Sequence, residues 1–159
     1  MLLTGCASKS YPPLDDKTQL QTREFQSKLF DINDTKSMSK IILNVLQDDG
    51  YLVRNVNPEL GFFNAEKRIE GKGYEFALYD LYYPIAIYKY LNREKAISFE
   101  CTINITQYKK QSKVRASFYM KSLSESNSVK NEQLVDDENF YQAFFAKIDK
   151  AVFIEQEGL

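Results

Sequence analysis

The chain has 159 residues, of which 43% are hydrophobic and 14% aromatic, enough for one compact domain with a sizeable core. Its 21 Lys and Arg against 22 Asp and Glu leave a net charge of −1, which gives no electrostatic basis for nucleic-acid binding. No apolar run in the sequence approaches the roughly 18 to 20 residues that a membrane-spanning helix requires.

The sequence contains no histidine, and its two cysteines are Cys6 and Cys101. The first fact excludes Ser-His-Asp and Cys-His mechanisms and removes the commonest metal ligand, and the second excludes a cysteine-based zinc site. The acidic residues are scattered, so no pair of them is favoured as general acid and base. We therefore predict a non-enzymatic protein with no catalytic residue, no metal site and no cofactor.

The most specific pattern lies near the N-terminus, where an apolar residue and two small residues precede a cysteine in Leu3, Thr4, Gly5 and Cys6. This pattern resembles the lipobox of bacterial lipoproteins. The resemblance implies cleavage before Cys6 and a diacylglyceryl group on its thiol. The alternative is an ordinary N-terminal thiol.

The lipobox divides the chain into three predicted parts. Residues 1–5 are interpreted as the remnant of a signal peptide, residues 6–21 as the lipidated cysteine with a flexible tether, and residues 22–159 as a single α+β domain. Ser8 and Lys9 follow the cysteine. By resemblance, these two residues favour a lipid anchor in the outer membrane of a Gram-negative bacterium, with the domain facing the periplasm.

In the first part of the domain, residues 22–30 are predicted to form a strand, and Asn33 and Asp34 to cap a helix. Apolar residues follow at helical spacing, and Gly50 is expected to end the helix in a left-handed conformation. Asp48 and Asp49 oppose the helix dipole in the last turn, so we predict a salt bridge there, with a partner contact as the alternative. The helical stripe consists of Met38, Ile41, Ile42, Val45 and Leu46.

In the remainder, residues 51–56 and 62–69 are predicted strands, and residues 95–107 and 114–120 alternate strictly as an antiparallel hairpin. Cys101 lies in the apolar register of that hairpin and is expected to be buried. Residues 122–134 are predicted to be a long loop. A second helix is predicted from Asp136-Asp137 to about Glu155, with a core stripe of Phe140, Phe144, Ile148, Ala151 and Val152.

The predicted order is β-α-β-β-β-β-α. Both helices carry one apolar stripe and the hairpin strands carry one apolar face each. The simplest arrangement is an α+β fold in which an antiparallel sheet of about five strands has both helices packed on one face.

Three blocks of sequence stand out: TREF at 22–25, LQDDGY at 46–51 with ELG at 59–61 and AEK at 65–67, and FYQAFF at 140–145 through 151–155. Together they resemble a family of bacterial envelope lipoproteins. The arrangement also resembles the helix-grip domains of the BamC lipoprotein, an accessory subunit of the β-barrel assembly machine. The resemblance implies a helix-grip-like fold and a binding role as a subunit of a cell-envelope assembly. It supplies no catalytic residue.

Six of the eleven tyrosines fall within 70–94, where no regular pattern is present. Tyrosine offers a large amphipathic face at low entropic cost and is enriched at protein interfaces, so these residues are the predicted partner-binding surface. The alternative is that they cover the sheet. They are Tyr74, Tyr79, Tyr82, Tyr83, Tyr88 and Tyr90.

A second hypothesis is a carrier or sensor of a lipid or another apolar ligand, held in a pocket between the helices and the sheet. Its candidate lining residues also have a plain core role as the alternative. They are Phe99, Phe118, Phe140, Phe144 and Ile148.

Overall fold

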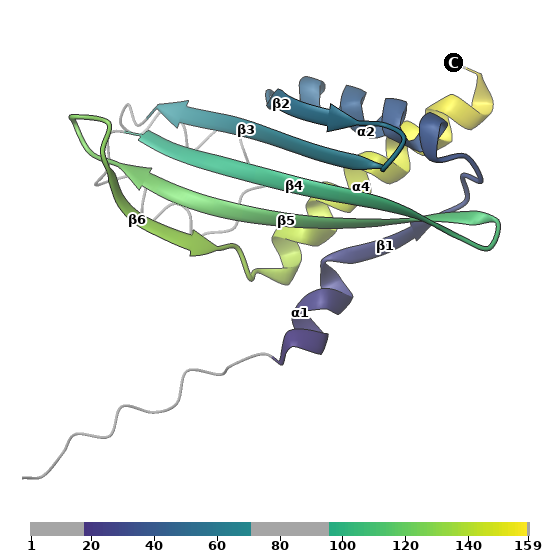
Figure 1. Cartoon of the computed structure of the whole chain (residues 1–159), viewed down its shortest axis with the longest axis horizontal. Coiled ribbons are helices and arrows are strands. Elements are labelled where there is room, and N and C mark those ends of the chain that lie inside the picture. The colour runs from purple at the N-terminus through teal and green to yellow at the C-terminus, as the bar shows by residue number, and fades with distance from the viewer. Residues whose placement is uncertain (1–17, 71–95, 159) are drawn as a thin grey trace, which may run out of the picture.

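The computed structural model describes residues 18–70 and 96–158, which form one antiparallel sheet with helices against it (Figure 1). The described strands and helices are α1 (Gln19–Phe25), β1 (Ser27–Phe30), α2 (Thr35–Asp48), β2 (Leu52–Asn57), β3 (Phe62–Glu70), β4 (Ala96–Tyr108), β5 (Gln111–Leu123), β6 (Val129–Leu134) and α4 (Glu138–Glu157).

The sheet is built around the β4–β5 hairpin, which pairs without interruption from Ala96 opposite Leu123 to Tyr108 opposite Gln111. This confirms the hairpin that strict alternation predicts. The strand order is β1-β5-β4-β3-β2, and β6 also pairs with β5. Two short strands therefore share one edge of β5: β1 pairs with residues 112–115, and β6 with residues 119–123.

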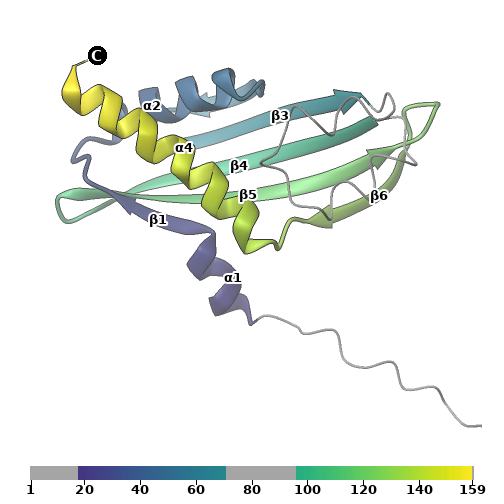
Figure 2. The same cartoon turned by 180° about the vertical axis from the view of Figure 1, so that it is seen from behind.

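Helices α2 and α4 cover the same face of the sheet, and α4 crosses the strands diagonally (Figure 2). The predicted α2 stripe is buried throughout, as are Phe140, Phe144, Ile148 and Val152 of α4. The α+β class and the placement of both helices on one face are thus confirmed. No helix within residues 18–70 and 96–158 is long and apolar enough to cross a membrane.

The two ends of α2 have the capping residues that the sequence predicts. Asp34 is the N-cap, and its carboxylate accepts hydrogen bonds from the hydroxyl and the backbone N–H of Ser37, which lower the pKa of Asp34. Gly50 follows the helix with φ of +80°, the predicted left-handed conformation. Asp49 forms an ion pair with Lys147 of α4, so the carboxylate that opposes the helix dipole has a cationic partner.

Two predicted elements are wrong. Residues 22–30 do not form one strand, because α1 occupies Gln19–Phe25 and only Ser27–Phe30 is extended. Helix α1 begins with a capping box between Thr18 and Gln21, inside the range predicted to be tether. The predicted loop over 122–134 contains the end of β5 and the whole of β6, whose six residues are all exposed.

The hydroxyl of Tyr141 closes the gap that β1 and β6 leave on the edge of β5. It accepts hydrogen bonds from the backbone N–H of Phe118 at 3.3 Å and from Nε2 of Gln26 at 3.2 Å. It donates to the carbonyl oxygen of Val135 at 3.0 Å. A side chain of α4 therefore takes the place of a backbone partner in the middle of a β-sheet edge.

Cys101 is buried on β4, facing the helices, as predicted. Removal of the thiol from water raises the pKa of Cys101 well above its ordinary value. The thiolate is the reactive form of cysteine, so this side chain is a packing group with little reactivity in the folded protein.

Candidate functional site

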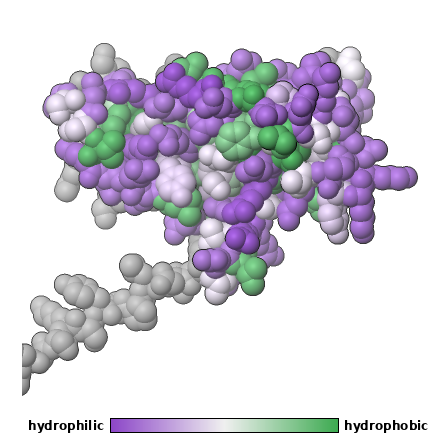
Figure 3. Space-filling view, in the orientation of Figure 1, coloured by the Kyte–Doolittle hydropathy of each residue, from purple (hydrophilic) through white to green (hydrophobic). Residues whose placement is uncertain are grey.

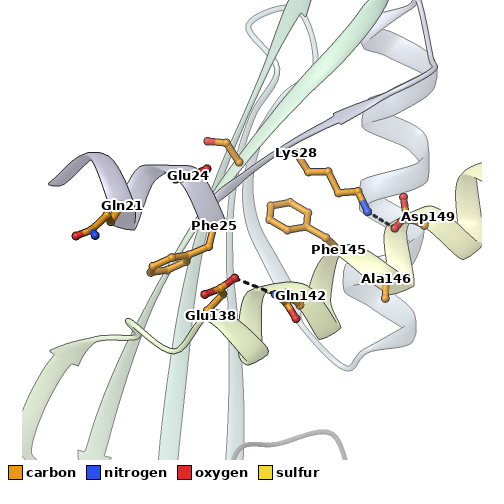
Figure 4. A pocket seen from close by; sticks show the side chains of 10 residues that line it. Gln21, Glu24, Phe25, Lys28, Glu138, Gln142, Phe145, Ala146 and Asp149 are labelled. Atoms are coloured by element: carbon orange, nitrogen blue, oxygen red, sulfur yellow. Dashed lines mark hydrogen bonds and ion pairs between the residues drawn. The ribbon is translucent and has the colours of Figure 1, made fainter. Parts of the chain in front are cut away.

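A groove with a volume of about 540 Å³ lies between α1, β1 and α4 (Figure 4). It opens to solvent beside the helix that follows the N-terminal segment. Its lining combines two aromatic rings with polar and charged side chains: Gln21, Glu24, Phe25, Ser27, Lys28, Glu138, Gln142, Phe145, Ala146 and Asp149.

Helix α1 forms one wall of the groove through a small number of contacts. None of its residues is buried, so packing contributes little to its formation and the capping box at Thr18 and Gln21 matters more. Its last residue, Phe25, is half-buried and places its ring 5.2 Å from that of Tyr141. This ring contact joins α1 to α4 beside the groove.

The floor and the far wall come from β1 and α4. Phe145 is buried and its ring lies 6.2 Å from that of Phe30. Lys28 and Asp149 form an ion pair across the end of the groove, and Gln142 donates a hydrogen bond to Glu138 at 3.0 Å. Both ion-pair partners are more than two-fifths exposed, so the pair fixes the geometry of the wall and adds little stability.

The charges around the groove are unequal. Glu24, Glu138 and Asp149 supply three carboxylates, and Lys28 supplies the only ammonium group among the described lining residues. An aromatic floor with an acidic rim suits an apolar side chain flanked by basic ones.

The described residues bring together no obvious reaction centre. No group of three or more His, Cys, Asp or Glu side chains within residues 18–70 and 96–158 could hold a metal ion. Within the groove, Glu138 is hydrogen-bonded to an amide and Asp149 is paired with a lysine.

The structure does not describe the residues that the sequence predicts to be lipidated or to form the partner-binding surface. Cys6 and the six tyrosines from Tyr74 to Tyr90 lie outside the described residues. Sequence reasoning missed the groove, although the Thr18-x-x-Gln21 capping signal and Phe25 could have indicated a helix there.

The five residues proposed to line an apolar pocket are all buried and belong to the core. Their rings contact one another: Phe118 lies 4.9 Å from both Phe140 and Phe144, and Phe99 lies 6.0 Å from Phe140. Ile148 is fully buried beside them. These side chains occupy the space between sheet and helices where the ligand of a carrier would lie.

Comparison with protein-family models finds no match for the chain, and comparison with curated proteins finds none either. Among solved structures, the chain is similar to a DUF4468 family protein from Bacteroides ovatus ATCC 8483, with a TM-score of 0.42 and 10% sequence identity. The likeness covers 79% of this chain and 84% of that chain.

Proposed function

We propose that this protein is a non-catalytic lipoprotein, anchored through Cys6 to the outer membrane on its periplasmic side, that binds another envelope protein as an accessory subunit. The observation that carries the proposal is the Leu3-Thr4-Gly5-Cys6 pattern ahead of a compact α+β domain. Attached acyl chains contribute about 0.8 kcal/mol per buried methylene, so two or more chains would hold the domain at the membrane.

The groove between α1, β1 and α4 supports the binding part of the proposal. It is open, has an aromatic floor, and carries more carboxylates than basic groups on its described rim. The predicted tyrosine surface from Tyr74 to Tyr90 is a second candidate contact for the same partner. The alternative function, a carrier of an apolar ligand, has less support because its proposed lining is part of the packed core.

The lipid anchor predicts a specific change in cell fractionation. A precursor with Cys6→Ser cannot form the thioether, so the protein should move from the membrane fraction to the soluble periplasmic fraction. The matched control is Cys101→Ala, which removes the buried thiol and should leave the protein with the membrane. Membrane association of the Cys6→Ser protein would contradict the anchor.

The groove predicts which surface a partner contacts. In crosslinking from intact envelopes, Glu24→Arg combined with Gln142→Arg should remove the crosslinked partner, because both exposed positions line the groove and the change reverses its charge. The control is Glu125→Arg with Gln133→Arg, the same charge change at exposed positions near β6.

Three outcomes of the capture experiment distinguish the contacts. Loss of the partner in the groove variant alone assigns the contact to the groove. Loss in a Tyr82→Ser, Tyr83→Ser, Tyr88→Ser variant assigns it to the tyrosine surface. Full recovery of the partner with both variants would contradict both assignments.

A further inference from the structure

We propose that the protein lies on the membrane in one orientation, with the surface formed by α1, β1 and the turn end of the β4–β5 hairpin against anionic phospholipid headgroups. We call this the basic face and define it by Leu20, Arg23, Leu29, Tyr108, Lys109, Lys110, Lys113 and Arg115. The inference rests on the proposed lipid anchor at Cys6 and adds which side of the domain the anchor presents to the bilayer.

The register of β5 places two cations of the basic face on the side of the sheet away from the core. Val114 and Ala116 are fully buried against the core, so Lys113 and Arg115, at alternate positions, point to the other side. On β1, Leu29 is opposite Lys113 and Ser27 is opposite Arg115. On β4, the neighbours of Lys113 and Arg115 are Thr106 and Asn104, which carry no charge.

Helix α1 adds a third cation and an exposed leucine. Arg23 and Leu20 line, with Leu29, Lys113 and Arg115, a shallow depression of about 690 Å³. Glu24 is the only carboxylate among the described residues that line it. The turn of the hairpin extends the positive charge through Lys109 and Lys110.

The cations of the basic face differ from those at the other end of the sheet. None of the ion pairs that join described residues includes Arg23, Lys113 or Arg115. At the other end, Lys121 is paired with Glu100 and Glu132, and Arg68 is paired with Glu70. The charges of Arg23, Lys113 and Arg115 are therefore not neutralised by an ion pair among the described residues, and the carboxylate of Asp31, on the hairpin side, accepts a hydrogen bond from Gln111.

Exposed apolar side chains stand among these cations. Leu20 is 76% exposed, Leu29 is 43% exposed and Tyr108 is 49% exposed, while Lys109 lies with its ammonium group 5.4 Å from the Tyr108 ring. Figure 3 shows this side of the domain as mostly hydrophilic, with several separate hydrophobic patches. Basic residues mixed with leucine and tyrosine suit the headgroup region, where the apolar parts enter the acyl boundary and the cations stay at phosphate level.

The basic face begins close in sequence to the proposed lipid anchor, and this favours a bilayer over an acidic protein as its binding partner. The segment between Cys6 and Gln19 can span at most about 45 Å, at roughly 3.5 Å per residue. Leu20 and Arg23 belong to the first described helix after that segment. Among the described residues, those closest in sequence to Cys6 thus begin the basic face. Each cation near an anionic surface strengthens binding about fivefold.

The test uses the full unlipidated chain coupled through Cys6 to a maleimide lipid in vesicles, followed by lysine acetylation and mass spectrometry. Because Cys101 is buried, coupling is directed to Cys6, and peptide masses verify this. On vesicles with about one-third phosphatidylglycerol, acetylation of Lys109, Lys110 and Lys113 should fall about fivefold relative to pure phosphatidylcholine. Lys36, Lys40 and Lys150, which are exposed on the helices that cover the opposite face of the sheet, should change less than about twofold.

A charge variant makes the same test more stringent. Arg23→Glu with Arg115→Glu should abolish the protection of Lys113 on anionic vesicles, whereas Lys36→Glu with Lys40→Glu, which changes the charge equally, should preserve it. Unchanged protection in the first variant, or equal acetylation of Lys113 on both vesicle types, would overturn the proposed orientation. Because coupling is chemical, that result leaves the cellular anchor untouched, and failure of the anchor appears only in the fractionation of the Cys6→Ser protein.

Discussion

Replacement of Tyr141 by phenylalanine is expected to lower the free energy of unfolding by about 3 kcal/mol, although only one oxygen atom is removed. The ring stays and its contacts with Phe25, Phe118 and Phe140 are preserved. The Phe118 N–H, the Gln26 amide and the Val135 carbonyl each lose a hydrogen-bond partner at a buried position. A buried polar group left without a partner costs about 1 to 3 kcal/mol, and local relaxation recovers part of the total.

Denaturant unfolding followed by circular dichroism measures this loss, with Tyr119→Phe as the matched control. Tyr119 lies on β5 next to Phe118 and is 44% exposed, so removal of its hydroxyl should change stability by less than about 0.5 kcal/mol. Equal stability of the Tyr141→Phe and wild-type proteins would show that the hydroxyl does not hold the two edge strands to α4.

The same residue predicts a dependence on alkaline pH. Burial raises the pKa of Tyr141 above its ordinary value, and the hydrogen bonds from Phe118 and Gln26 offset this only in part. A raised pKa means that the folded state favours the neutral phenol. The stability advantage of wild type over Tyr141→Phe should therefore be complete below a pH of about 10 and decline as the pH rises further.

The elements that sequence reasoning found are those with one buried face. Residues Ile97 to Ile105 and Val114 to Met120 alternate because one side meets the core, and the α2 stripe repeats because it packs on the sheet. A periodic apolar pattern arises where one face of an element is buried, so the sequence predicts each of these elements close to its observed position.

The elements that it missed have no buried face. None of the residues of α1 is buried, and all six residues of β6 are exposed, so neither leaves a period in the sequence. Strand β6 exists because the backbone of β5 offers hydrogen bonds along its edge, and Lys130 and Glu132 keep the outer edge polar. Neither the hydrogen bonding along the edge of β5 nor the polar outer edge of β6 produces an apolar pattern in the sequence.

For a different reason, the groove and the basic face were not predicted from the sequence. The groove joins Phe25 of α1 to Phe145 of α4, and the basic face joins Arg23 to Arg115 of β5. Such pairs are far apart in the sequence. The register of β1 on β5 brings Arg23 near Arg115, and the packing of α4 against α1 and β1 brings Phe145 near Phe25. The sequence could supply the residue types at these sites, but their grouping depends on the sheet.

The turn between β2 and β3 places Gly61 in contact with β4. Its φ is +63°, its carbonyl oxygen accepts a hydrogen bond from the Ile105 N–H at 2.7 Å, and the Leu60 N–H donates to the Asn57 side chain at 3.0 Å. A methyl group added at Gly61 would lie 2.5 Å from the Ile105 carbonyl oxygen and 2.9 Å from the Ile105 Cβ. The carbonyl oxygen is a main-chain atom and the Cβ is bonded to the main chain, so neither can move away freely. The approach of the turn to β4 therefore requires glycine.

Gly61→Ala is therefore expected to destabilise the protein by about 3 kcal/mol, of which about 1 kcal/mol is the cost of a left-handed alanine and the remainder is the displacement of the turn from β4. Gly50→Ala is the matched control, because Gly50 has φ of +80° and a methyl group there would lie 3.8 Å from its nearest neighbour, the Cε of Lys67. That variant should lose only the conformational part. Thermal unfolding of both proteins separates the two contributions, and hydrogen exchange should show faster exchange of the Ile105 amide in Gly61→Ala alone. Equal destabilisation of the two variants would mean that the turn does not need its close approach to Ile105.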